Sequence, residues 1–145
     1  ADVIVFEYLE MQGKISGNKK QKLHLWRKRD IQKLCEHQAH RKGIRVSRVS
    51  ARNTSRLACD GSGVVVRNQE NHSLCTFRTG KQYNCDLSAS YNIGARYFIR
   101  ELLKPLPGTG RSSLEAKVPA VKRRTSCVYA DLRKLYVEVN NLKAA

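Results

Sequence analysis

Two carboxylates stand at positions from which they could serve a catalytic centre. Glu7 lies near the end of a β-branched and aromatic run, and Asp86 opens a segment with helical periodicity. Phosphodiester hydrolysis with two divalent ions needs carboxylates that converge from different elements, because the metals contact both the attacking water and the leaving oxygen. Two structural alternatives stand beside this interpretation: Glu7 as a solvated charge at a strand end, and Asp86 as a helix N-cap.

The charge of the chain points to a polyanionic partner. The 145 residues carry 28 Lys and Arg against 12 Asp and Glu, a formal net charge of +16 and a pI near 10.1. Such a surface neutralises phosphates and releases their counterions, so it binds DNA or RNA with a steep salt dependence. The charge alone is equally compatible with a ribosomal or chromatin-type protein that binds nucleic acid without chemistry.

The cysteines and the hydropathy pattern indicate the compartment. Five cysteines are an odd number, and neither a signal peptide nor a long apolar run accompanies them. We therefore expect a reduced, cytoplasmic chain that does not interact with a membrane. The chain enters a predicted strand almost at its first residue, which suggests a piece of a longer polypeptide.

The first third of the chain predicts a strand, a loop, a helix and a second strand. Residues 2–9 have the apolar composition of a buried strand, and residues 12–22 form a glycine- and lysine-rich basic loop. Apolar residues recur at helical spacing over 23–41, and Gly43 is placed to end that helix. Residues 44–49 then alternate with the period of two that is typical of a strand.

The remainder is expected to contain an insertion, two helices and a linker. Residues 52–84 have short apolar runs and several glycines, and a helix runs from Asp86 to about residue 103. Residues 105–125 contain all three prolines and are interpreted as a linker. The last segment has an amphipathic helical stripe that must pack on another element, and it consists of Val128, Leu132, Leu135, Val139 and Leu142.

Three stretches, taken in order, resemble the RuvC core of TnpB and its type V CRISPR relatives. Residues 3–9 are similar to the strand that ends in the family's second catalytic acid. Residues 26–55 are similar to the run that leads into the family's zinc ribbon, and 86–96 to its third acidic motif. The resemblance covers residues 2 to about 103.

This resemblance implies an α/β fold of the RNase H-like (RuvC) kind, present as its C-terminal portion. The implied organisation has a RuvC segment at 1–51, a degenerate zinc-ribbon-like, target-nucleic-acid-binding insertion at 52–84, and a second RuvC segment at 85–104. Residues 105–145 follow as a basic linker and a C-terminal helix.

The resemblance further implies metal-dependent endonucleolytic cleavage of DNA in an RNA-guided system. Glu7 and Asp86 would hold Mg²⁺ or Mn²⁺, and the partners would be guide RNA, target DNA and the remainder of a larger effector polypeptide. The family's first catalytic Asp would lie upstream of Ala1, so this segment alone has an incomplete carboxylate set. A nuclease-inactive, guided DNA-binding relative and a ribosomal-type RNA-binding protein remain as alternatives.

The insertion departs from the family pattern of two CxxC pairs, which makes a four-thiolate zinc site. The corresponding stretches begin at Cys59 and Cys75, but Ser62 and Arg78 occupy the second position of each pair. Serine and arginine do not bind zinc, so we expect a ribbon shape without zinc and with both cysteines buried as small apolar residues. By residue type, Cys85 and His72 could complete a set of four zinc ligands with Cys59 and Cys75, but their spacing in the sequence is unlike that of a zinc ribbon.

Cations around the insertion are candidates for phosphate contacts, because the resemblance implies that this region guides single-stranded DNA toward the metals. A solvated basic face is the alternative for each of them. The candidates are Arg56, Arg67, Arg78 and Arg96.

Overall fold

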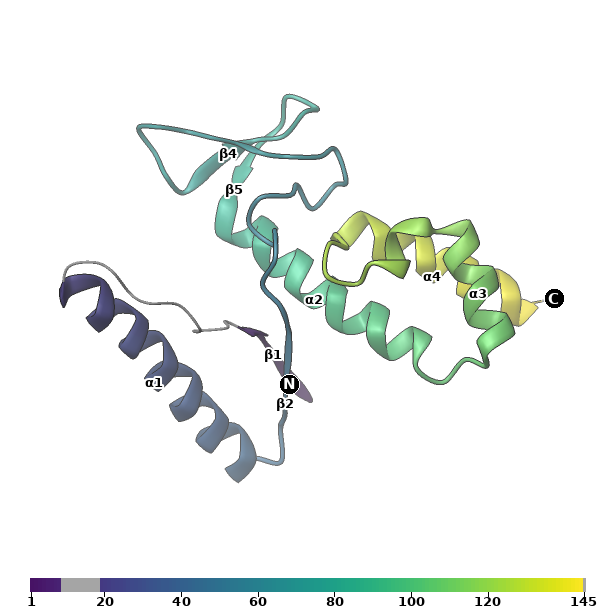
Figure 1. The fold of residues 1–145 in the computed structure, drawn as a ribbon, viewed down its shortest axis with the longest axis horizontal. Helices are drawn as coiled ribbons and strands as arrows, with labels where there is room; N and C mark the ends of the chain where they lie inside the picture. The colour runs from purple at the N-terminus through teal and green to yellow at the C-terminus, as the bar shows by residue number, and fades with distance from the viewer. Residues whose placement is uncertain (9–18, 145) are drawn as a thin grey trace. The chain divides into compact units, whose positions relative to one another are not determined.

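The computed structural model describes the backbone of residues 1–8 and 19–144, and the side chains of residues 1–8 and 30–142. The chain divides into two compact units, Ala1–Arg48 and Val49–Ala145, and each is described by itself. The described residues form a mixed α/β structure with four α-helices and two small β-sheets (Figure 1). None of the described helices combines the length and the apolar character that a membrane span requires.

The first unit contains strand β1 (Val3–Tyr8) and helix α1 (Lys19–Arg41), and strand β2 (Arg45–Ser50) begins in it. Strands β1 and β2 form a two-stranded sheet. Both predicted strands and the predicted helix are confirmed. The loop that was expected over residues 12–22 ends earlier, because residues 19–22 belong to the helix. Residues 19–22 are helical because Lys and Gln are good helix formers, and residues 12–18 lie outside the described residues.

Helix α1 ends as the sequence predicted. Gly43 adopts a φ of +66°, in the left-handed region that glycine tolerates best. Its N–H donates to the His40 carbonyl at 3.1 Å, and the N–H of Ile44 donates to the Ala39 carbonyl at 2.9 Å. These two bonds make a Schellman motif, which satisfies carbonyls of the last helical turn.

The apolar face predicted for α1 is only partly buried. Ala39 is 2% exposed, whereas Ile31 and Leu34 are 59% and 67% exposed. The side chains of Leu23 and Trp26 lie outside the described residues. Helical periodicity therefore predicted the helix correctly but did not predict which of its apolar side chains are covered.

The insertion in the second unit is a small three-stranded antiparallel ribbon. It consists of β3 (Val66–Arg67), β4 (Leu74–Thr76) and β5 (Gln82–Asn84), in the order β3-β4-β5. Cys75 lies opposite Arg67 on one side and Tyr83 on the other. A single bridge between Leu57 and Val64 extends the ribbon toward its entry.

Helix α2 (Cys85–Leu103) follows the ribbon directly. Its N-cap is Asn84, whose side-chain oxygen accepts a 2.9 Å hydrogen bond from the Leu87 N–H. Asp86 lies one position inside the helix, in the first turn, so the N-cap alternative for Asp86 is wrong. A carboxylate in this turn interacts favourably with the helix dipole.

The linker expected over residues 105–125 is helical instead. Helix α3 (Gly108–Lys117) and the 3-10 helix η1 (Pro119–Lys122) occupy most of it. The reason is burial: Leu114, Val118 and Val121 are 0%, 5% and 0% exposed. Pro105 lies in the turn after α2, Pro107 is the N-cap of α3, and Pro119 is the first residue of η1, so none of them lies inside α3.

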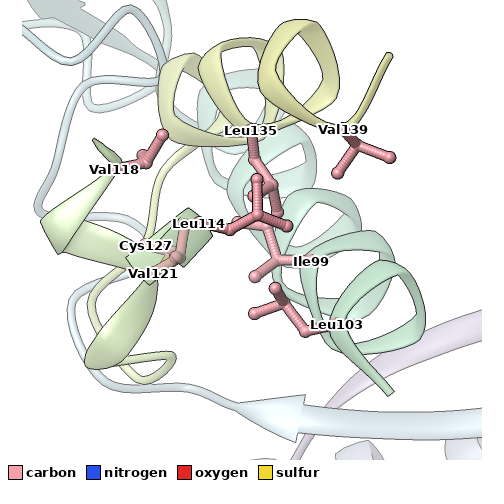
Figure 2. Packing of buried hydrophobic residues seen from close by; sticks show 8 residues of the cluster. All are labelled: Ile99, Leu103, Leu114, Val118, Val121, Cys127, Leu135 and Val139. Carbon is pink, nitrogen blue, oxygen red and sulfur yellow. The ribbon is translucent and has the colours of Figure 1, made fainter. Parts of the chain in front are cut away.

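Helix α4 (Tyr129–Ala144) completes the second unit. As predicted, its apolar stripe packs on other elements: Leu135 and Val139 contact residues of α2, α3 and η1 in one cluster (Figure 2). Leu142, at the end of the stripe, is 43% exposed. The cluster consists of Ile99, Leu103, Leu114, Val118, Val121, Cys127, Leu135 and Val139.

Candidate functional site

The first predicted carboxylate, Glu7, is the fifth residue of β1 and is half-buried. Its backbone carbonyl accepts a 3.5 Å contact from the Gln32 side-chain amide, which ties the end of the strand to α1. Strand β1 therefore places Glu7 one residue before its end.

The second predicted carboxylate, Asp86, is exposed in the first turn of α2. Glu7 belongs to the first unit and Asp86 to the second. Within the described part of the chain, no three His, Cys, Asp or Glu side chains come together in a group that could hold a metal ion.

The ribbon is built on buried cysteines, as the sequence predicted. Cys59, Cys75 and Cys85 are 9%, 1% and 3% exposed and pack with Phe77 and Val65 in one apolar cluster. Burial, together with the neighbouring Cys85, raises the pKa of the Cys75 thiol to about 11. The Cys75 thiol donates to the Tyr83 carbonyl at 3.4 Å. The Cys75 thiol is thus packed as a neutral group that donates within the ribbon.

The two positions that depart from the zinc-ribbon pattern lie beside each other. A Cβ placed on Gly63 would lie 3.4 Å from Cδ of Arg78, so the Arg78 side chain passes over the loop that carries Ser62. The Ser62 hydroxyl is buried, and the Ser62 backbone N–H donates to the Asp60 carboxylate at 2.9 Å.

Three of the four predicted phosphate-binding arginines are exposed. Arg56 lies in the turn before the ribbon, Arg67 in β3 and Arg78 after β4. Arg67 also donates to the Ser55 carbonyl at 3.4 Å, a long contact that leaves the guanidinium at the surface. All three belong to the ribbon and its entry, so their side chains can reach a ligand from solvent.

Arg96 differs from these three because it is 3% exposed. Its Nε donates to the Cys127 carbonyl at 3.1 Å, and its Nη1 donates to the Ser50 carbonyl at 2.5 Å. The guanidinium thus joins three segments of the second unit. This placement gives Arg96 a structural role, and its contact with phosphate stays a prediction.

Sequence reasoning missed the polar residues that hold the ribbon on α2. Asn92 is fully buried and its side-chain amide donates to the carbonyls of Thr54 and Leu57, at 2.9 and 2.8 Å. The Ser88 hydroxyl accepts a 3.2 Å bond from the Cys59 N–H. The spacing of Ser88 and Asn92, four residues apart on one helical face, is the signal that could have identified them.

Comparison with protein families gives a match over the middle of the chain. Residues 29–93 match the family described as Cas12f1-like, TNB domain. The matched segment begins within α1, includes the whole ribbon and ends in α2, which is less than half of the chain. Comparisons with curated proteins and with solved structures gave no match. The family match supports a relationship of this chain to TnpB and Cas12f-like proteins through its ribbon-containing segment.

Proposed function

We propose that this chain binds nucleic acid as the C-terminal RuvC and ribbon portion of an RNA-guided effector of the TnpB and type V kind. The observation that carries the proposal is the match of residues 29–93 to the Cas12f1-like TNB domain. The matched segment contains all three exposed candidate arginines, and the whole chain has a net charge of +16. A ribosomal-type RNA-binding protein would account for the charge but not for this match.

The same proposal assigns an RNase H-like fold and cleavage of guided DNA. Glu7 and Asp86 supply carboxylate oxygens, the ligands that Mg²⁺ and Mn²⁺ prefer. The divalent ions would stabilise the charge that develops on the phosphate during hydrolysis. Because Asp86 is exposed at a helix start, its carboxylate can turn toward a site completed by the rest of a larger polypeptide and by guide RNA and target DNA.

Fluorescence anisotropy with labelled single-stranded and duplex DNA and RNA, over a series of salt concentrations, tests the binding. The variant to compare combines Arg56→Gln, Arg67→Gln and Arg78→Gln. Each phosphate that the variant no longer neutralises should reduce the slope of log K against log salt by about 0.7 to 0.9. A matched variant removes three exposed charges outside the ribbon, with Lys104→Gln, Lys122→Gln and Arg123→Gln.

The expected result is a slope smaller by about two or more in the ribbon variant and a lesser reduction in the control. Equal reductions of this slope in the two variants would show that the ribbon arginines contribute no more to binding than other surface charges do. Absence of salt-dependent binding by the unmodified chain would overturn the proposed function.

A further inference from the structure

An apolar groove runs between α2 and α4 in the second unit. It has a volume of about 470 Å³, and its walls include Phe98 and Leu102 of α2 and Tyr136 of α4. Phe98 and Tyr136 are 52% and 57% exposed, which is unusual for two neighbouring aromatic side chains in a chain of this charge. A contiguous exposed apolar surface of this kind marks an interaction site.

A second hollow of about 320 Å³ lies where the ribbon meets α2 and α4. Tyr83, Tyr91 and Lys81 contribute to its walls. Tyr129 and Arg133 line both hollows, so the two meet at these residues and form one path from the ribbon along α4. We call this path the aromatic groove.

The rings in the aromatic groove are fixed in place. The Tyr91 and Tyr129 rings lie 5.2 Å apart between centroids, at 43° to each other. The backbone beneath Tyr129 is held at 3.0 Å by the Asn92 side-chain oxygen, and the next N–H, that of Ala130, donates to the Cys59 carbonyl at 2.9 Å. A platform that is already ordered loses little entropy when a flat ligand stacks on it.

Cations accompany the rings along the groove. Arg133 lies where the two hollows meet, and the Lys81 ammonium lies 4.7 Å from the centroid of the Tyr83 ring. The one carboxylate that lines the groove, Asp60, accepts bonds from the Ser62 N–H at 2.9 Å and from the Thr79 hydroxyl at 3.4 Å. The groove therefore offers aromatic faces and positive charge together, while its anion is engaged within the ribbon.

We propose that the aromatic groove binds a short stretch of single-stranded nucleic acid, with bases stacked on Tyr129 and its neighbouring rings and phosphates beside Arg133 and Lys81. Exposed rings alternating with cations are the combination that binds single strands without sequence preference. The net charge of +16 favours a polyanion over a peptide segment as the occupant, because each nucleotide brings both a phosphate for the cations and a flat base for the rings. This inference rests on the proposed function and assigns its contact surface.

The test compares two labelled oligonucleotides of equal length and charge, about ten nucleotides each, one of thymidine and one abasic throughout. The intact chain should bind the thymidine strand roughly 5- to 150-fold more tightly, since the abasic strand keeps the phosphates but cannot stack. Tyr129→Ala should remove most of this ratio, and Tyr129→Phe, which keeps the ring, should retain it. Tyr136→Ala is a second variant, at a more exposed position.

Tyr8→Ala serves as the control, because Tyr8 is 58% exposed and lines neither hollow. Salt-dependent binding with no preference for bases, or an unchanged preference in folded Tyr129→Ala, would overturn the groove while leaving the proposed function intact. Absence of binding to either strand would overturn the groove, whereas salt-dependent binding of duplex DNA or RNA by the same chain would show that the proposed function stands without it. A chain that self-associates, and that Tyr136→Ala converts to a monomer without affecting base preference, would instead assign the groove to contact between copies.

Discussion

The side-chain oxygen of Asn92 accepts a hydrogen bond from the backbone N–H of Tyr129 at 3.0 Å. The same amide donates to the carbonyls of Thr54 and Leu57, so one buried side chain in α2 joins the ribbon entry to the start of α4. These bonds cross 35 to 38 residues of sequence. The ribbon and the C-terminal helices therefore share one polar anchor.

Replacing this anchor should destabilise the second unit. Asn92→Ala removes three hydrogen bonds and leaves buried backbone groups without partners, so the free energy of unfolding should fall by about 3 kcal/mol. Chemical denaturation followed by circular dichroism measures this. Asn140→Ala, at an exposed position of α4, is the matched control and should change stability by less than about 0.5 kcal/mol. Equal effects would show that the Asn92 bonds contribute little.

Substitution of the buried Arg96 should affect protein stability, whereas substitution of the exposed Arg67 should affect nucleic-acid binding. Arg96→Met leaves the Ser50 and Cys127 carbonyls without their donor, and should cost about 3 kcal/mol of stability. Arg67→Met should cost less than about 0.5 kcal/mol, but should reduce the slope of log K against log salt for nucleic-acid binding by about 0.7 to 0.9. A folded Arg96→Met protein with a reduced salt slope would contradict the structural role of Arg96.

The sequence predicted those elements whose local pattern matches their environment. Strand β1, helices α1, α2 and α4, and the turn at Gly43 all follow from periodicity or glycine placement. The helices between Pro105 and Thr125 were missed because all three prolines and several small residues lie there, while Leu114, Val118 and Val121 supply the helical apolar spacing. Packing on α2 and α4 outweighed weak local propensity there.

In the candidate site, too, the sequence predicted the features that depend on residue type but not those that depend on distant partners. Burial of Cys59 and Cys75 could be predicted, because thiols without zinc partners behave as small apolar residues. The roles of Asn92 and Arg96 could not, because each depends on carbonyl partners at least 31 residues away. Side-chain type alone suggested a surface cation at Arg96, whereas burial depends on the tertiary fold.

The stability of the second unit should fall at alkaline pH. Burial, together with the nearby Asp131 carboxylate, raises the pKa of the Cys127 thiol to about 11. The folded state then holds a proton that the unfolded state has released, so stability is complete below about pH 8.5 and falls as the pH rises toward 11. Cys127→Ala should reduce the slope of stability against pH over this interval by about 1 kcal/mol per pH unit. Urea denaturation at pH 8, 9 and 10 compares the two proteins. Parallel curves would show that this thiol is not the group responsible.

Zinc binding should be restorable at the ribbon. The unmodified chain is expected to hold no zinc, because Ser62 and Arg78 replace two of four thiolates. A variant that combines Ser62→Cys with Arg78→Cys recreates both CxxC pairs, and should bind about one zinc per chain and unfold at a higher temperature with zinc than with a chelator. Atomic absorption and thermal melts measure these effects. Either single variant is the control. Tightly held zinc in the unmodified chain, absent from Cys59→Ala, would contradict the expectation.

The N-terminus of α2 permits a test of Asp86 that separates metal binding from helix stability. Because Asn84 is the N-cap, Asn84→Ala should cost about 1 kcal/mol of stability, whereas Asp86→Asn loses only an exposed charge near the helix dipole and should cost less. If Asp86 is a metal ligand, Asp86→Asn should nevertheless reduce Mg²⁺-dependent cleavage by the guide-bound effector by several orders of magnitude, since an amide is a much poorer ligand for a hard ion. Guided DNA binding should be retained in both variants.

Cleavage, binding and melting temperature are measured together. Full cleavage by Asp86→Asn would exclude a catalytic role for this carboxylate, and equal losses of cleavage in Asn84→Ala and Asp86→Asn would assign the effect to the helix.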